Sequence, residues 1–188
     1  MRILAIAGSL RRDSLNARLL RCIAGRAPEG VEVELFDGLR EIPPYDADDD
    51  VEPAPAPVAG LREAIADADG LLIATPEYNS SIPGVLKNAI DWASRPKGTA
   101  ALAGKPAAVV GATTGMFGAV WAQAELRKVL NTAGARPLDL ELGIAHADRA
   151  LDETGRPHDL EIDRRAWGVM SALVAAIAAE REPQLAAA

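Results

Sequence analysis

The sequence lacks several features that would point to particular classes of protein. Its single cysteine, Cys22, excludes an intrachain disulfide and is expected to pack as a small hydrophobe. The formal net charge of -7 argues against non-specific binding to nucleic acid or to an anionic membrane surface, because both need clustered positive charge. No apolar run approaches the roughly 18 residues of a membrane span. The two histidines, His146 and His158, lie far apart, so no metal site is expected.

The apolar stretch at the start of the chain is too short for a signal peptide. Ile3–Ala7 leads directly into Gly8 and Ser9, as a buried strand leads into a loop, and we therefore expect a cytoplasmic protein. The 188 residues fit one domain under the usual size of about 100–200 residues, and 49% of them are hydrophobic, which is enough for a substantial core. No repeat or low-complexity linker divides the chain. A single domain over residues 1–188 is expected.

Short apolar runs alternate along the chain with longer segments whose apolar residues recur at helical spacing. The runs, typical of strands, lie at 3–7, 31–36, 70–75, 106–111 and 137–142. The helical segments lie at 14–26, 61–68, 85–92, 120–132 and 166–179. This alternation predicts an α/β fold of three layers, a five-stranded parallel sheet with helices on both faces. Trp92, Trp121 and Trp167 fall within the expected helices and are expected in the core or at an interface.

A proline- and aspartate-rich stretch at 42–57 interrupts the alternation after the second expected strand. Asp46, Asp48 and Asp50 have the spacing that begins a calcium-binding loop. However, Val51 stands where that loop needs glycine, and Pro57 stands where it needs glutamate. The stretch is therefore expected to form an acidic surface flap without a bound cation.

The loop after the first expected strand, Gly8–Asn16, carries residues suited to an anion. Its neutral hydrogen-bond donors are Ser9, Ser14 and Asn16. Arg11 adds a guanidinium group suited to phosphate, and the following helix begins here, so its dipole favours an anion. Neither the dinucleotide-binding glycine motif nor the P-loop motif follows the strand. The loop indicates a monophosphate site; the alternative is an ordinary helix start capped by Asp13 or Ser14.

Two more loops of unusual composition, 75–84 and 112–118, follow the third and fourth expected strands. In the first, prolines stiffen the backbone, and Tyr78 and Asn79 offer an aromatic surface and an amide to a flat heteroaromatic ring. Each loop alone could be an ordinary polar turn. In a doubly wound sheet, however, ligands bind outside the carboxyl ends of the strands, where all three loops are expected to meet. That coincidence favours a binding site for a phosphate and a flat ring.

The motifs G-S-L-R-R-D-S-L-N at Gly8–Asn16 and P-E-Y-N-S-S-I-P-G-V-L-K-N-A-I-D-W at Pro76–Trp92 resemble the NADPH-dependent FMN reductase family. The similarity extends to Ile42–Asp46, Thr113–Gly115 and Leu151–Arg156, and so spans nearly the whole chain in the expected order. The resemblance implies a flavodoxin-like fold with sheet order 2-1-3-4-5. It also implies a homodimer or homotetramer with the flavin near a subunit interface.

The resemblance also implies a cofactor site and a reaction. The FMN phosphate would be held by Ser9, Arg11, Ser14 and Asn16. The isoalloxazine ring would be lined, largely by backbone groups, by Pro76, Glu77, Tyr78 and Asn79, and on its other side by Thr113, Thr114 and Gly115. NADPH or NADH would pass a hydride to the flavin, which would reduce an acceptor such as free flavin, a quinone, an azo dye or a metal oxyanion. The cofactor performs the redox chemistry, so no catalytic side chain is expected.

Two other functions remain open at this point. One is a flavodoxin-type electron carrier, and the other is a flavin-binding module without turnover. Carriers of that type usually have a hydroxyl-rich phosphate loop without arginine, so Arg11 and the long Pro76–Trp92 motif favour the reductase.

Overall fold

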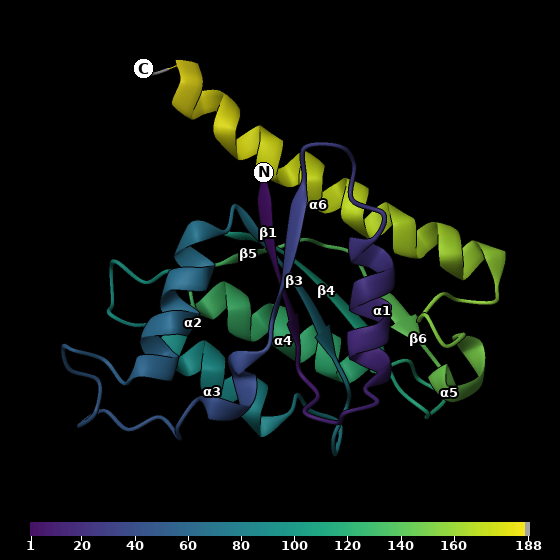
Figure 1. The fold of residues 1–188 in the computed structure, drawn as a ribbon, viewed down its shortest axis with the longest axis horizontal. Coiled ribbons are helices and arrows are strands. Elements are labelled where there is room, and N and C mark those ends of the chain that lie inside the picture. Colours follow the sequence, from purple (N-terminus) through teal and green to yellow (C-terminus); the bar gives the residue numbers. More distant parts are fainter. Residues whose placement is uncertain (187–188) are drawn as a thin grey trace.

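The computed structural model describes residues 1–186, with side chains to residue 180, and shows one sheet between two layers of helices (Figure 1). The strands are β1 (Arg2–Ala7), β2 (Glu32–Phe36), β3 (Gly70–Thr75), β4 (Pro106–Ala112), β5 (Arg136–Pro137) and β6 (Leu142–Ile144). The helices are α1 (Leu15–Ala24), the 3-10 helix η1 (Gly38–Glu41), α2 (Ala56–Asp67), α3 (Gly84–Ala93), α4 (Val120–Thr132), α5 (Ala147–Ala150) and α6 (Leu160–Ala186).

The strands pair in the order β2-β1-β3-β4-β5, with β6 also paired to β4, and every pairing is parallel. The expected order 2-1-3-4-5, with helices on both faces, is confirmed. The direction in which strands are added reverses between β1 and β3, and their carboxyl ends lie side by side at the lower edge of the view in Figure 1. Such a reversal creates the crevice in which doubly wound sheets bind ligands.

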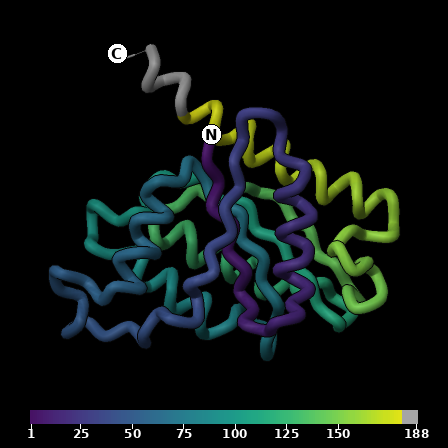
Figure 2. The backbone as a smooth tube through the Cα atoms, in the orientation of Figure 1, coloured from purple at the N-terminus to yellow at the C-terminus, as the bar shows by residue number. Residues whose placement is uncertain are grey.

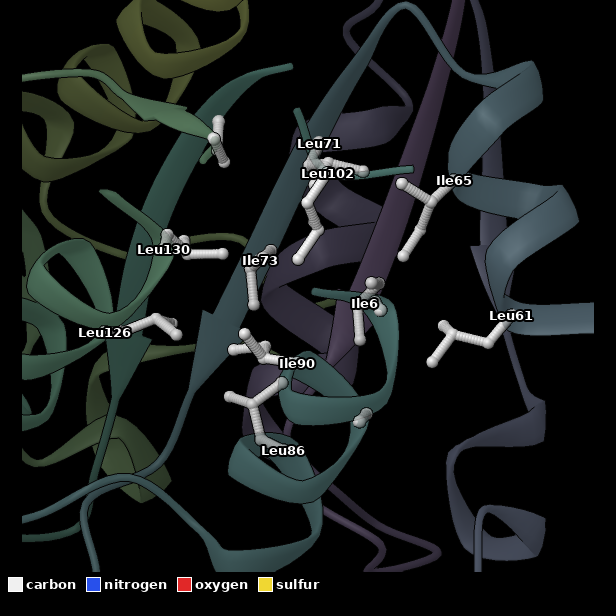
Figure 3. Close-up of a cluster of buried hydrophobic side chains, with 14 of the residues drawn as sticks. Ile6, Leu61, Ile65, Leu71, Ile73, Leu86, Ile90, Leu102, Leu126 and Leu130 are labelled. Atoms are coloured by element: carbon white, nitrogen blue, oxygen red, sulfur yellow. The ribbon is translucent and has the colours of Figure 1, made fainter. Parts of the chain in front are cut away.

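Alternate residues of the central strands face opposite helical layers. Ile6 packs with α2, α3 and α4, as Figure 3 shows, whereas Ile3 and Ala5 pack with α1 and α6. Every residue of β3 and β4 is buried, because helices cover both faces of the sheet. Truncating one buried leucine in such a core to alanine costs about 2–5 kcal/mol. The strands therefore give the loops at their carboxyl ends a rigid base.

The fifth strand differs from the expectation of one strand at 137–142. It is divided into β5 and β6, which pair with opposite ends of β4. Ala107 pairs with Pro137, and Val110 pairs with Leu142, so three steps along β4 match five steps along the other segment. Two residues of the segment between Pro137 and Leu142 therefore have no counterpart on β4 and lie outside the regular strand pairing. Apolar Leu138, Leu140 and Leu142 alternate with polar residues as in a continuous strand, so the sequence pattern does not reveal the two extra residues.

Helix boundaries agree with the expected segments at α1, α3 and α4 to within about two residues, the usual uncertainty of helix ends. Two helices begin earlier than expected: α2 at Ala56 and α6 at Leu160, where the expected segments began at 61 and 166. Both extensions are polar or proline-containing first turns that lack the apolar spacing. Of the three tryptophans, Trp92 is fully buried in the core, whereas Trp121 and Trp167 are about half exposed.

The stretch at 42–55 is an irregular loop, the expected flap, and projects away from the sheet beside α2 and α3 (Figure 2). Its first half is attached to α3. Asn88 accepts from the Tyr45 amide at 2.7 Å and donates to the Pro43 carbonyl at 2.8 Å. The Trp92 indole donates to that same carbonyl at 2.8 Å, and the Tyr45 ring contacts the Trp92 ring edge-on. The flap is therefore held in place by α3.

No helix within residues 1–186 is long and apolar enough to cross a membrane. Among the side chains that the structure describes, no cluster of three histidine, cysteine or acidic residues is arranged to hold a metal ion.

Candidate functional site

The loop after β1 turns sharply at Gly8. The Gly8 amide donates to the Ala74 carbonyl at 2.8 Å and so extends the contact between β1 and β3. A Cβ at Gly8 would lie 2.9 Å from the end of the Leu86 side chain and 3.5 Å from the Pro76 ring, so a larger residue there would force the Leu86 side chain to shift. Arg40 of η1 donates to the Leu10 carbonyl at 2.8 Å and supports the loop from outside.

The first loop ends in a helix start that is capped as the sequence suggested. The hydroxyl of buried Ser14 accepts from the Ala17 amide at 3.2 Å, so Ser14 rather than Asp13 is the N-cap of α1. Asp13 is exposed and lies 3.9 Å from Arg18. Arg11 and Arg12 are both exposed, and neither forms a salt bridge with any residue that the structure describes. The start of α1 therefore carries two free guanidinium groups.

Asn16 has a structural task that its place in the sequence did not suggest. It is buried, and its side chain donates to the Ala112 carbonyl at 2.8 Å and accepts from the Ala112 amide at 2.9 Å. Ala112 is the last residue of β4, so Asn16 joins the first loop to the third. Its side-chain amide has a second hydrogen that these bonds do not use. The expected contact with a phosphate stays a prediction.

The second loop contains a tight turn. Tyr78 and Ser81 exchange two backbone hydrogen bonds of 3.0 and 3.1 Å around Asn79 and Ser80. Both central residues have positive φ, 53° and 60°, as a type I′ turn requires. The side chains of Tyr78 and Asn79 are exposed, whereas Ile82 and Pro83 are buried below the turn. The turn therefore presents its polar tip at the carboxyl edge of the sheet.

The Glu77 carboxylate binds the start of α4. One oxygen accepts from the Trp121 and Ala122 amides, each at 3.0 Å. Ala119, at the N-cap position, has a left-handed φ of 60° and no side chain able to cap the helix. Glu77 therefore supplies the missing cap and a negative charge at the positive end of the helix dipole. Glu77 was expected to line the ring largely through its backbone, and sequence reasoning missed this side-chain contact.

The third loop is supported by the chain that follows it. The Ala147 amide donates to the Thr113 carbonyl at 2.9 Å, and the His146 amide donates to the Gly115 carbonyl at 3.0 Å. The Thr113 hydroxyl accepts from the Gly115 amide at 3.2 Å. Thr114 and Gly115 are exposed at the tip. Thr113, Thr114 and Gly115 thus follow β4 at the carboxyl edge of the sheet, and their expected contact with a flavin stays a prediction.

Two glycines pack the base of the third loop against β6. Gly118 has a φ of 59°, and a Cβ there would lie 2.8 Å from the carbonyl carbon of Gly143. The Gln123 side chain, fully buried, donates to the Gly118 carbonyl at 3.0 Å. Its side-chain oxygen has no partner among the residues that the structure describes. Neither Gly143 nor Gln123 was a candidate in the sequence.

An exposed apolar rim borders the second and third loops. Its members are Tyr78, Met116, Phe117 and Trp121, with exposed fractions of 48%, 65%, 57% and 47%. The rings of Phe117 and Trp121 meet edge-on with centroids 4.8 Å apart. An apolar surface of this kind normally marks a place where a ligand or a protein binds.

The Leu151–Arg156 segment lies outside the site and supports α1. Gly155 has a φ of 85°, and its backbone contacts that of Arg18 so closely that no Cβ fits. The Asp152 carboxylate accepts from Thr154 and Arg156 within this turn, and these hydrogen bonds hold its pKa below the usual range. Asp163 of α6 forms a salt bridge with Arg26, and that hydrogen bond lowers the pKa of Asp163.

The direct contacts between the loops make them one site. The Gly8 amide binds the Ala74 carbonyl just before the second loop, Asn16 binds Ala112, and Glu77 binds the Trp121 amide after the third loop. Free guanidinium groups and a helix start stand at one end of the site, and exposed backbone turns and hydroxyls stand at the other. This donor set fits a ligand with a phosphate and a flat polar ring, as FMN has.

Comparison with known proteins supports that assignment. A family model described as NADPH-dependent FMN reductase matches residues 1–149. An NAD(P)H-dependent FMN reductase of Pseudomonas aeruginosa is 46% identical over 157 residues, which are 83% of this chain and 84% of that protein. A 2-hydroxy-1,4-benzoquinone reductase of Burkholderia sp. is 42% identical over 156 residues, 82% of this chain and 84% of that protein.

A solved structure is similar over nearly the full length. The flavoenzyme NAD(P)H:(acceptor) oxidoreductase FerB of Paracoccus denitrificans superimposes with a TM-score of 0.82 and 36% identity, over 94% of this chain and 96% of that one. The matched region contains all three loops, from Gly8 to Gly115. The chain belongs to the NADPH-dependent FMN reductase family.

Proposed function

We propose that this chain is an FMN-dependent NAD(P)H oxidoreductase whose flavin lies across the three loops at the carboxyl ends of β1, β3 and β4. The observation that carries the proposal is the set of hydrogen bonds that ties the three loops together, from Gly8 to Ala74, from Asn16 to Ala112 and from Glu77 to the start of α4, which supports the phosphate end and the ring end as parts of one surface. When bound, FMN accepts a hydride from NADPH or NADH and passes electrons to the acceptor.

The phosphate is held at the start of α1. Arg11 supplies the charge, and the hydroxyl hydrogens of Ser9 and Ser14 and the second amide hydrogen of Asn16 supply neutral donors. Ser14 and Asn16 are buried and fixed by their own hydrogen bonds, so they lose little freedom when the ligand binds. The positive end of the α1 dipole adds to the attraction.

The isoalloxazine ring is held between the second and third loops. Pro76, Glu77, Tyr78 and Asn79 present backbone groups to one side, and Thr113, Thr114 and Gly115 present backbone and hydroxyl groups to the other. The Glu77 carboxylate is occupied by the start of α4 and acts by fixing the distance between the loops. No side chain of the site needs to transfer a proton to the substrate.

The apolar rim of Tyr78, Met116, Phe117 and Trp121 suits flat, aromatic acceptors. Quinones are acceptors of this shape, and one relative is named a 2-hydroxy-1,4-benzoquinone reductase. We infer a quinone or a free flavin as the acceptor class.

Three further properties belong to the same proposal. The chain is one domain, which the packing of α1 to α4 and α6 on one sheet supports. The chain forms a homodimer or homotetramer, for which the exposed apolar rim is an available surface. It acts in the cytoplasm, where NAD(P)H is produced.

Purified protein reconstituted with FMN tests the function. The expected result is steady oxidation of NADPH or NADH with a quinone, free flavin or ferricyanide as acceptor. A flavodoxin-type carrier would bind FMN and turn over only with a separate reductase, and a flavin-binding module would not turn over at all. Failure to bind FMN would overturn the proposal for the site.

A further inference from the structure

The two halves of the third loop are held by different parts of the chain. Residues 113–115 form the half that is expected to contact the flavin, which we call the flavin half, and the segment after β6 holds it. The Thr113 carbonyl accepts from the Ala147 amide at 2.9 Å, and the Gly115 carbonyl accepts from the His146 amide at 3.0 Å. These supports do not involve the far end of the loop, so the flavin half keeps its position when that end is loosened.

Residues 116–118 form the other half, which we call the acceptor half because it carries part of the apolar rim. The start of α4 holds it. The Val120 amide donates to the Phe117 carbonyl at 3.2 Å, and the Trp121 ring meets the Phe117 ring edge-on. Both rings are about half exposed, so this surface contact alone gives Phe117 little restraint.

A buried hydrogen bond directly after Phe117 adds the missing restraint. The Gln123 side chain is fully buried, and its nitrogen donates to the Gly118 carbonyl at 3.0 Å. Among the residues that the structure describes, Gln123 is the one donor to that carbonyl. Without this donor, the buried carbonyl would gain free energy by turning toward water, and the loop would move with it.

Three glycines provide the space for this hydrogen bond. A Cβ at Gly143 of β6 would lie 2.5 Å from the Gly118 carbonyl oxygen, and a Cβ at Gly111 of β4 would lie 3.0 Å from the Gln123 side-chain nitrogen. Gly118 itself has a φ of 59°, which glycine adopts without strain. The carbonyl and the amide thus occupy space that side chains would otherwise fill.

The other end of the same side-chain amide indicates that Gln123 does more than fill the interior. Its oxygen is buried and has no hydrogen-bond partner among the described residues, and an unpaired buried oxygen lowers stability. An apolar side chain of similar size, such as methionine, would avoid that cost. Departures of this kind from a fully satisfied interior are typical of functional sites.

We propose that Gln123 is a positioning residue that sets the place of Phe117 and, through it, the affinity for flat acceptors. Gln123 does not touch the acceptor. It fixes Gly118, and Gly118 fixes the chain at the preceding residue, Phe117. Because the flavin half has its own supports, Gln123 acts on the acceptor and not on FMN. The inference rests on the proposed oxidoreductase function and on the apolar rim as the acceptor surface.

Gln123→Met tests the proposal, because it keeps the size of the side chain and removes the donor. Leu126→Met, three residues further along α4 and also fully buried, is the matched control. Steady-state kinetics are measured with NADPH and each of two acceptors. One is 1,4-benzoquinone, a flat ring, and the other is ferricyanide, a compact anion that needs no flat surface. Quenching of FMN fluorescence gives the FMN dissociation constant.

In Gln123→Met, the KM for the quinone should rise about tenfold, because an apolar contact with the acceptor is lost. The kcat with the quinone should not change, because that contact is made equally before and during the reaction. The KM for ferricyanide and the FMN dissociation constant should stay within about twofold of the wild type, since they depend on separate contacts. Leu126→Met should leave all of these constants unchanged.

Hydrogen exchange of the protein without FMN gives a second measurement. In Gln123→Met, exchange should become faster at the Val120 amide, which binds the Phe117 carbonyl, and stay unchanged at the His146 amide, which binds the Gly115 carbonyl. This pattern would show that the substitution loosens the acceptor half and leaves the flavin half in place.

A double-mutant cycle with Phe117→Ala shows whether Gln123 acts through the Phe117 ring. Phe117→Ala alone should raise the KM for the quinone, and the addition of Gln123→Met should raise it less than about twofold further. A residue with a purely structural role would change the constants for quinone, ferricyanide and FMN together, and its effect would add to that of Phe117→Ala.

An unchanged KM for the quinone, equal changes for both acceptors, or additive effects in the cycle would overturn the proposal. If Gln123→Met does not fold, titration of the FMN-loaded wild type with the quinone answers the same question by NMR. The Gln123 side-chain amide signals should shift with the same dissociation constant as the Phe117 amide, and a shift of Phe117 without one at Gln123 would overturn the proposal. A wild type that fails to oxidise NADPH with ferricyanide would contradict the proposed function itself.

Discussion

The first and third loops meet at the same edge of the sheet, yet they are stabilised in different ways. In the first, the serines make local contacts: Ser14 caps the helix that follows, and Ser9 accepts from the Arg11 amide at 3.4 Å, while Asn16 makes the long-range contact to Ala112. The third is held by distant residues. Glu77 caps α4, the helix that follows the third loop, by accepting from the Trp121 amide 44 residues further along the chain. Gly143 packs against Gly118 at the base of the loop.

Because of this difference, substitutions in the two loops should affect ligand binding and fold stability to different degrees. The exposed side chains of the first loop can be removed with little effect on the fold, since they contact few other groups. Changes at the supports of the third loop disturb packing, and therefore change stability and ligand geometry together. The predictions below use that contrast, from the largest expected effect to the smallest.

The largest effect is expected for Gly118→Ala. A Cβ there meets the Gly143 backbone at 2.8 Å, and φ is positive, so the free energy of unfolding should fall by about 3 kcal/mol. Gly115→Ala is the matched control, because its Cβ would lie 3.6 Å from the Thr113 hydroxyl in ordinary contact, and should cost less than about 1 kcal/mol. Urea unfolding without FMN measures both. Equal losses would show that the third loop is not tightly packed.

Asn16→Ala should lower the free energy of unfolding by about 2 kcal/mol, because it leaves the amide and carbonyl of Ala112 buried without partners. Asn131→Ala, at an exposed position of α4, should change stability by less than about 0.5 kcal/mol. Thermal and urea unfolding of the three proteins make the comparison. If Asn16→Ala were as stable as the wild type, the hydrogen bonds between Asn16 and Ala112 would make no contribution to the free energy of unfolding.

Arg11→Ala should leave stability unchanged and weaken FMN binding by about tenfold, since a charged hydrogen bond to phosphate is lost. Its neighbour provides the control: Arg12→Ala removes the same charge from a position that is also exposed and should change the dissociation constant less than about threefold. Quenching of FMN fluorescence measures both constants. An equal effect of the two substitutions would assign the phosphate contact to general charge rather than to Arg11.

Glu77→Gln keeps an acceptor oxygen for the start of α4 and removes the negative charge from its dipole. The expected loss of stability is about 1 kcal/mol or less. Faster hydrogen exchange should appear at the Trp121 and Ala122 amides and remain absent at the start of α1. Glu125→Gln, within α4, is the control. Unchanged exchange at Trp121 would mean that the negative charge of Glu77 does not strengthen the cap.

The same contrast explains how much the sequence could predict. Apolar runs located β1, β3 and β4, and therefore the loops that follow them, because strands covered on both faces must be apolar throughout. The cap at Ser14 was within reach because it is a local pattern. The division of the fifth strand was not, because the surplus residues show only in the register with β4.

The supports of the third loop were also beyond prediction. Asn16 and Ala112 are separated by 96 residues, and Glu77 and Trp121 by 44. A buried hydrogen bond at such a separation leaves no local periodicity, and each of these residues reads as part of a polar turn or helix start. The motif resemblance marked Asn16 and Glu77 as candidates for the site, and only the fold showed what their side chains contact.

The central claim is that the three loops form one FMN site, and amide NMR spectra during titration with FMN test it most directly. The amides of Ser9 and Arg11, of Tyr78 and Asn79, and of Thr113 and Gly115 are predicted to shift together and to saturate with one dissociation constant at one FMN per chain. Shifts confined to one loop, different constants for different loops, or shifts at another surface would contradict the account.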